Sequence, residues 1–236
     1  MLAPQKIRPA TTFPLAVKAV MVDLDGTMLD TAADLSAAIN AMMRDLGRAE
    51  LPVSQIQTYI GKGIQKLVKR SLTQSMDFDP DDALFAEAMP MYEIEYAKTL
   101  TLETRPYPGV VEGLKTMKAE GFHMACITNK AGRFTLPLLV NTGLRDFFEI
   151  VIAGDTLPEK KPHPLPLLHA CQHFGIQPHE MLLIGDSLND AQAARAAGCH
   201  VFIVPYGYNE GRDVRELDTD KVVANLVEAA GLIQKI

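Results

Sequence analysis

Two aspartates end an apolar run near the start of the chain, in the stretch V-M-V-D-L-D-G-T at residues 20–27. Alternate side chains of a β-strand point to the same face, so Asp23 and Asp25 would begin on one side of the strand. Carboxylates that close repel each other, and one of them is pushed toward its protonated form. Alone, such a pair at a strand end is often a solvated turn, so a chemical role depends on further residues elsewhere in the chain.

Further polar residues follow three later apolar runs. They are Thr128 and Asn129 after 122–127, Lys160 and Lys161 in the loop after 149–153, and Asp186 and Asp190 after 181–184. In open α/β sheets, ligands bind beside the carboxyl ends of the strands. If the apolar runs are parallel strands, all of these side chains face one crevice.

This set of residues suits phosphoryl transfer assisted by Mg²⁺. Mg²⁺ prefers oxygen ligands, and it would offset the repulsion between Asp23, Asp25 and Asp186. Lys161 adds positive charge, and Thr128 can donate a hydrogen bond to a phosphoryl oxygen. One aspartate can attack phosphorus to form an aspartyl-phosphate, while a second carboxylate protonates the leaving alcohol and later activates water.

The elements that must position these residues follow from the apolar pattern. Near-continuous apolar runs suit strands buried on both faces of a parallel sheet, and they occur at 17–24, 122–128, 149–153, 181–185 and 200–204. Helices are predicted at 132–141, 164–174, 188–197 and 219–235. Alternating strands and helices imply right-handed crossovers. The predicted fold class is therefore α/β, with a Rossmann-like parallel sheet core.

The region between the first two strands has helical patterns instead. Apolar residues recur at helical spacing over 31–46, 64–72 and 81–99, and Pro90 is expected to kink or break the last of these helices. Ser54 and Gln57 are spaced as in a capping box.

These patterns divide the chain into a core with an insertion. We predict an all-helical cap at 30–105, inserted into a core made of 17–29 and 106–236. Residues 1–16 contain three prolines and lack periodicity, so they are interpreted as a loose N-terminal extension.

Composition narrows the class of protein. The 236 residues are 47% hydrophobic and 22% charged, with a formal net charge of -6, which disfavours nucleic-acid binding. No apolar stretch is long enough for a signal peptide or a membrane span. Cys126, Cys171 and Cys199 are odd in number and far apart, so we expect core residues and a reducing compartment. We therefore predict a cytoplasmic monomer or homodimer, without a nucleic-acid or membrane partner.

Four motifs together resemble those of the haloacid-dehalogenase-like hydrolases. They are D-L-D-G-T (23–27), I-T-N (127–129), K-K-P (160–162) and G-D-S-L-N-D (185–190), in the order of that family. The resemblance implies that Asp23 is the nucleophile and a metal ligand. It also implies that Asp25 is the acid–base residue and contacts the metal through its backbone carbonyl.

The remaining roles are carried over in the same way. The resemblance implies that Thr128, Asn129 and Lys161 bind phosphate and that Asp186 binds Mg²⁺. Asp190 would support the site from behind. The insertion resembles the small helical cap of this family, which closes over the site and selects the substrate.

The substrate is expected to be a small anionic phosphate. Stretches at 29–35, 60–63, 161–164 and 206–211 resemble members of the family that hydrolyse 2-phosphoglycolate to glycolate and phosphate. Lys62 in the cap and Arg133 after the second strand are predicted as possible substrate contacts. Other hypotheses stay open: a phosphatase for a sugar phosphate or pyrophosphate, a sugar phosphomutase, a phosphonatase, or a non-catalytic binding module.

Overall fold

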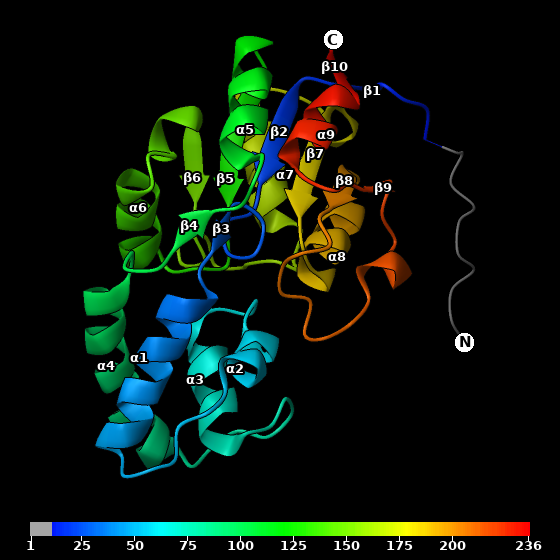
Figure 1. Cartoon of the computed structure of the whole chain (residues 1–236). Helices are drawn as coiled ribbons and strands as arrows, with labels where there is room; N and C mark the ends of the chain where they lie inside the picture. The colour runs from blue at the N-terminus through cyan, green and yellow to red at the C-terminus, as the bar shows by residue number, and fades with distance from the viewer. Residues whose placement is uncertain (1–10) are drawn as a thin grey trace, which may run out of the picture.

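The computed structural model describes residues 11–236, and residues 1–10 lie outside the described part. The chain forms an α/β core and a cap of four helices. The core lies above the cap in the view of Figure 1. The predicted fold class, a Rossmann-like sheet with an inserted helical cap, is confirmed. Among the described residues, no helix combines the length and apolar character needed to cross a membrane.

The core is built on a parallel sheet of six strands in the order β6-β5-β2-β7-β8-β9. Its strands are β2 (Ala19–Val22), β5 (His123–Ile127), β6 (Ile150–Ile152), β7 (Met181–Gly185), β8 (His200–Ile203) and β9 (Lys221–Val222). The register sets Val22 beside Cys126 on one side and Ile184 on the other. The ends of β2, β5 and β7 therefore lie next to one another, and the predicted site residues follow these strands.

Alternate residues of the strands enter two separate apolar layers. Val20 and Val22 of β2 pack on one face, and Ala19 and Met21 pack on the other. The first face is covered by α5 (Val110–Ala119), α6 (Gly132–Asn141) and α9 (Leu226–Gly231). The second is covered by α7 (Leu165–Phe174) and α8 (Leu188–Ala197). Burial on both faces explains why the strands are apolar throughout.

The cap consists of α1 (Ala32–Asp45), α2 (Val53–Tyr59), α3 (Ile64–Thr73) and α4 (Asp82–Thr99). Two linkers join it to the core, and they pair as the short antiparallel strands β3 (Leu29–Asp30) and β4 (Arg105–Pro106). The predicted break at Pro90 is wrong, because α4 runs through it. Pro90 is exposed, so water can hydrate the carbonyl that the proline leaves unpaired.

Other predicted boundaries also differ from the structure. The strand expected at 17–24 is two strands: β1 (Leu15–Val17) pairs with β10 (Ile233–Lys235), and β2 belongs to the sheet. Regular structure thus begins inside the expected N-terminal extension. The helix expected at 219–235 is wrong, because β9 and β10 flank α9, whose first turn is capped by the Asn225 side chain. The capping box at Ser54 is also wrong, since Pro52 precedes α2 and no side chain caps it. The helix α5 was not predicted.

Candidate active site

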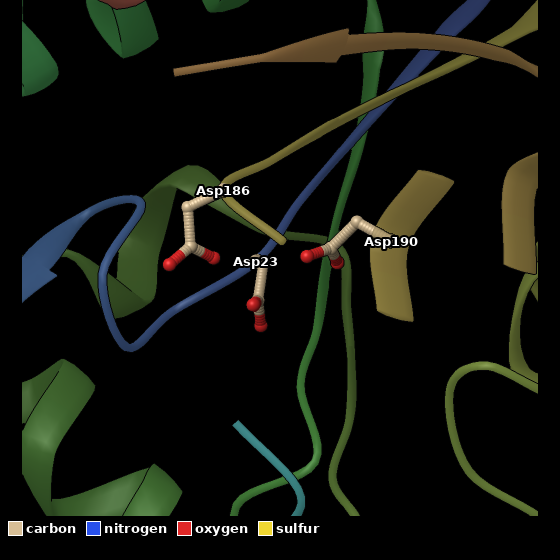
Figure 2. A group of neighbouring side chains, drawn as sticks. All are labelled: Asp23, Asp186 and Asp190. Atoms are coloured by element: carbon tan, nitrogen blue, oxygen red, sulfur yellow. The ribbon is translucent and has the colours of Figure 1, made fainter. Parts of the chain in front are cut away.

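The predicted site residues meet at the carboxyl ends of the central strands. Asp23 is the first residue after β2, and its N–H donates to the Ile184 carbonyl at 2.9 Å. The ends of β5 and β7 deliver Thr128 and Asp186 to the same pocket. Figure 2 shows Asp23 between Asp186 and Asp190. One carboxylate oxygen from each of the three residues lies within 4.8 Å of the other two.

Lys161 neutralises part of this cluster. Its Nζ lies 2.9 Å from Asp23 Oδ1, and it donates to Asp190 Oδ1 at 2.6 Å and to the Ile127 carbonyl at 2.8 Å. Burial disfavours the ammonium, but the two aspartates raise the pKa of Lys161 above its ordinary value. The other oxygen of Asp190 accepts from Ser187 Oγ at 2.6 Å. Both carboxylate oxygens of Asp190 thus have hydrogen-bond partners, and Asp190 holds Lys161 in place.

The cluster fits a divalent cation. Asp23, Asp186 and Asp190 bring three carboxylates against the single ammonium of Lys161, an excess of two negative charges if all are ionised. Burial raises the pKa of Asp23 to about 7, against the lowering effect of Lys161, and it also raises the pKa of Asp186. Apart from the ion pair with Lys161 at 2.9 Å, Asp23 Oδ1 has no hydrogen-bond partner within residues 11–236. Mg²⁺ would supply the missing charge with the oxygen ligands that it prefers.

Asp186 is enclosed by two glycines that leave space for it. Its carboxylate accepts from Thr27 Oγ1 at 3.2 Å and from the N–H of Tyr208. A Cβ on either Gly26 or Gly207 would lie 2.2 Å from Asp186 Oδ2, and Gly26 also has φ +84°. Other residues would therefore displace this carboxylate, which explains the glycine of D-L-D-G-T.

Asp25 has a lysine of its own. Lys130 Nζ donates to both carboxylate oxygens of Asp25, at 2.9 and 3.1 Å. The Lys130 side chain is only 2% exposed, and its Nζ lies 4.8 Å from the ring centroid of Tyr96 in α4. The repulsion expected between Asp23 and Asp25 is thus relieved by two separate cations, Lys161 and Lys130.

The residues after β5 connect the site to the cap. Thr128 is buried in the pocket, and its Oγ1 accepts from the N–H of Lys130 at 3.2 Å. Asn129 Nδ2 donates to the Gly61 carbonyl of the cap at 3.0 Å and to the Lys161 carbonyl at 2.8 Å. Asn189 Nδ2 donates to the same Gly61 carbonyl at 3.3 Å. Two asparagines of the core therefore hold the cap loop over the site.

The two predicted substrate contacts lie outside the pocket lining. Lys62 Nζ is 3.5 Å from Glu210, which also accepts from the buried Arg70 at 2.7 Å. Arg133 pairs with Glu93 of α4, at the rim between core and cap. Both cations are engaged in contacts between core and cap.

The pocket closes between a charged floor and an apolar roof. The core contributes its aspartates, Lys130 and polar side chains, whereas the cap contributes Leu35, Ile60, Gly61, Gly63, Ile64 and Leu67. The space open to the centres of water molecules is only about 30 Å³. A substrate can enter only if the cap moves away from the core.

The residues of this site that were not predicted from the sequence include Lys130, Tyr208 and Glu210. Lys130 directly follows Thr128 and Asn129, so its position beside two predicted site residues could have indicated a role in the site. Tyr208 and Glu210 lie in a loop after β8, where the sequence shows no pairing partner for either. Tyr208 Oη donates to Asp30 at 2.6 Å and accepts from the N–H groups of Thr31 and Ala32 at 3.0 Å, so this loop also holds the linker to the cap.

Comparison with known proteins agrees with this fold. Residues 20–204 match the model of the haloacid dehalogenase-like hydrolase family, and the chain belongs to this family. The resemblance predicted from the four motifs is confirmed.

Relatives within the family cover nearly the whole chain. A phosphoglycolate phosphatase of Nitrosospira multiformis is 66% identical over 94% of this chain and 98% of the relative, and one of Thiobacillus denitrificans is 60% identical over 95% and 99%. A crystal structure described as a predicted phosphoglycolate phosphatase from Haemophilus somnus is 31% identical, with a TM-score of 0.86 over 90% of this chain and 96% of that one. The prediction of an enzyme, a phosphatase of this family, is confirmed.

Proposed function

We propose that the chain hydrolyses 2-phosphoglycolate to glycolate and inorganic phosphate, with Mg²⁺ as cofactor and through an aspartyl-phosphate on Asp23. The observation that carries the proposal is the 66% and 60% identity, over almost the whole length, to two phosphoglycolate phosphatases. The arrangement of charged residues in the pocket supports the same chemistry.

The first step is attack on phosphorus. A carboxylate oxygen of Asp23, which is held in place by Lys161 at 2.9 Å, forms the new bond to phosphorus as the ester P–O bond breaks. Asp25 lines the same pocket and enters this step in its protonated form, and its proton passes to the leaving glycolate oxygen. Thr128, Asn129 and Lys161 bind the phosphoryl oxygens, and Lys161 stabilises the charge of the transition state.

The second step restores Asp23. The carboxylate of Asp25, left ionised by the first step, takes a proton from the water that attacks the aspartyl-phosphate. The bond between phosphorus and Asp23 breaks, and inorganic phosphate leaves. Asp25 is then protonated again, as it was before the first step. The apolar roof of the cap keeps other water molecules away during the first step.

The metal would be held on the side of Asp186. Asp23, Asp186 and the backbone carbonyl of Asp25 are the proposed ligands, while Asp190 supports the site through Lys161. Bound there, Mg²⁺ would neutralise phosphoryl charge and orient the substrate. The balance of three carboxylates against one ammonium supports this assignment.

A panel of phosphate esters tests the proposal. We expect the purified chain with Mg²⁺ to release phosphate from 2-phosphoglycolate with the highest kcat/KM of the panel, and Asp23→Asn to lose at least about 1,000-fold. Asp155→Asn is the matched control, because Asp155 is a loop carboxylate that accepts from the Gly132 N–H at 2.8 Å, outside the metal cluster. Full activity in Asp23→Asn would refute the mechanism. A higher kcat/KM for a sugar phosphate or pyrophosphate, or an isomerised sugar phosphate as product, would refute the substrate.

Location and assembly remain predictions. We propose that the enzyme acts in the cytoplasm as a monomer or homodimer, without a nucleic-acid or membrane partner. The three cysteines, which are buried and free, support a reducing compartment.

A further inference from the structure

Among residues 11–236, Lys130 is the one lysine or arginine whose atoms line the pocket, while Lys161 contacts the pocket-lining Asp23 from outside the lining. Its ammonium is almost fully buried, between the Asp25 carboxylate and the Tyr96 ring. A buried cation needs a structural or chemical reason, because removing it from water is costly. The single carboxylate of Asp25 and the ring face account for two sides of the ammonium.

The position of Lys130 relative to Asp25 places it beside the leaving group. In the proposed mechanism Asp25 lies within a hydrogen bond, about 2.7 Å, of the ester oxygen. Lys130 Nζ is 2.9 Å from one oxygen of Asp25. The carboxylate of 2-phosphoglycolate is separated from its ester oxygen by one methylene group, so it falls within reach of this ammonium. Lys161, in contrast, lies on the side of Asp23 and Asp190.

The rest of the pocket offers no second cation to that carboxylate. The residues that the cap contributes to the lining are four aliphatic side chains and two glycines. Lys62, the cap lysine that the sequence suggested, has its Nζ near Glu210. A substrate carboxylate that enters with the phosphate would need a cation, because a buried unpaired charge is strongly unfavourable.

We propose that Lys130 is the residue that recognises the carboxylate of the substrate and so sets the preference for carboxylated phosphate esters. This proposal rests on the proposed function, since it names the residue that selects its substrate. The alternative role, in which Lys130 only positions Asp25, would affect all phosphate esters alike.

The test compares two substrates that differ in one group. Ethyl phosphate has a methyl group where 2-phosphoglycolate has a carboxylate. We expect Lys130→Met to lower kcat/KM for 2-phosphoglycolate roughly 10- to 100-fold more than for ethyl phosphate, the range for loss of a charge-assisted hydrogen bond. Lys66→Met is the matched control, because Lys66 also pairs with a carboxylate, Asp79, but on the cap surface.

The outcomes separate the two proposals. If Lys130→Met lowers kcat/KM equally for both substrates while the wild type prefers 2-phosphoglycolate, the proposed role of Lys130 is overturned and the proposed function is not. Loss of the preference in Lys62→Met but not in Lys130→Met would assign the role to the cap and also overturn it. A wild type without preference for 2-phosphoglycolate would overturn the proposed function.

Two further variants guard against misfolding. Lys130→Gln keeps a hydrogen-bond donor for Asp25 without the charge, and we expect it to lose the preference as Lys130→Met does. Lys130→Arg keeps the charge, and we expect it to retain the preference within about 5-fold. If the ratio of kcat/KM for 2-phosphoglycolate to kcat/KM for ethyl phosphate is the same in Lys130→Gln and in Lys130→Arg, the proposal is contradicted.

Discussion

The floor of the pocket, formed by the core, contains charged side chains, whereas its roof, formed by the cap, is apolar. On the floor, Asp23 and Asp25 each have a buried lysine within 3 Å, Lys161 and Lys130 respectively. The roof presents aliphatic side chains and glycines to the pocket, and the cap cations Lys62 and Arg70 are directed to Glu210 at the rim. Both regions contain cations, but only the floor places them against the reacting groups.

This difference separates two tasks. Chemistry needs charges fixed in advance around the phosphoryl group, and a rigid sheet edge can hold them. Closure needs contacts that can break and form again, and the contacts at the rim and to Gly61 join core to cap. Removing a floor lysine should therefore damage the chemical step, whereas removing a rim contact should weaken closure.

The largest effect is expected on the floor, at Lys161. Lys161→Met leaves Asp23 and Asp190 as buried carboxylates without their cation, and it removes a positive charge beside the phosphoryl group. We expect kcat/KM to fall roughly 100- to 1,000-fold. We also expect the free energy of unfolding to fall by about 3 to 5 kcal/mol, as for broken buried ion pairs. Steady-state kinetics and chemical denaturation measure the two effects.

Lys160→Met is the control for this variant. Lys160 is the preceding residue, but it is exposed and donates to the Lys62 carbonyl at 3.1 Å. We expect its kcat/KM to stay within about 3-fold of the wild type. A comparable loss in both variants would contradict the division between floor and rim.

The floor could be predicted from the sequence because it follows a rule of topology. Parallel strands bring their carboxyl ends to one edge, so Asp23, Thr128 and Asp186 had to meet once the strands were identified. Burial on both faces made those strands visible as continuous apolar runs. The strand order placed the loop with Lys160 and Lys161 near this edge. The phosphate-binding role of Lys161 rests on the resemblance of its motif, since no periodicity fixes where a loop residue points.

The rim could not be predicted in the same way. Glu210 meets Arg70 across 140 positions of sequence, and that contact depends on how the cap is oriented on the core. The sequence predicts Lys62 and Arg133 as possible substrate contacts because they are cations near the site. Their actual partners, Glu210 and Glu93, lie in separate elements whose approach no local pattern reveals.

A smaller effect is expected at the rim, at Glu210. Burial disfavours its carboxylate, but Arg70 and Lys62 lower the pKa of Glu210 below its ordinary value, so the ion pair is intact at neutral pH. Glu210→Gln leaves the buried guanidinium of Arg70 without an anion. We expect closure to weaken and kcat/KM to fall about 10-fold for 2-phosphoglycolate and ethyl phosphate alike.

The matched control is Glu216→Gln, an exposed glutamate in the following 3₁₀ turn. It should leave kcat/KM unchanged. A fall for only one of the two substrates in Glu210→Gln would show that the rim takes part in substrate selection, against the separation of tasks.

The smallest effect is expected at a charge cluster of the core far from the pocket. Asp220 accepts from Arg195 and from the Val201 N–H, each at 2.8 Å, and it lies 3.6 Å from His200. Burial raises its pKa, but these hydrogen bonds outweigh burial and lower the pKa well below the ordinary value. The stabilisation is therefore complete above the unfolded-state pKa, near 3.9, and is lost as pH falls below it.

Asp220→Asn should lower the free energy of unfolding by about 1 to 2 kcal/mol at pH 7 while kcat/KM stays within about 2-fold of the wild type. The loss should shrink as the pH is lowered from 5 to 3, because Asp220 then becomes protonated in the unfolded wild type, which stabilises the unfolded state, while the folded carboxylate stays ionised. Asp218→Asn is the control, since Asp218 accepts from the same Arg195 at 3.1 Å but is 71% exposed, and an exposed pair contributes little. Denaturation curves at several pH values measure the difference. A large loss of activity in Asp220→Asn would mean that buried charge matters for catalysis wherever it lies in the core, and that position at the pocket floor is not what distinguishes Asp23 and Asp25.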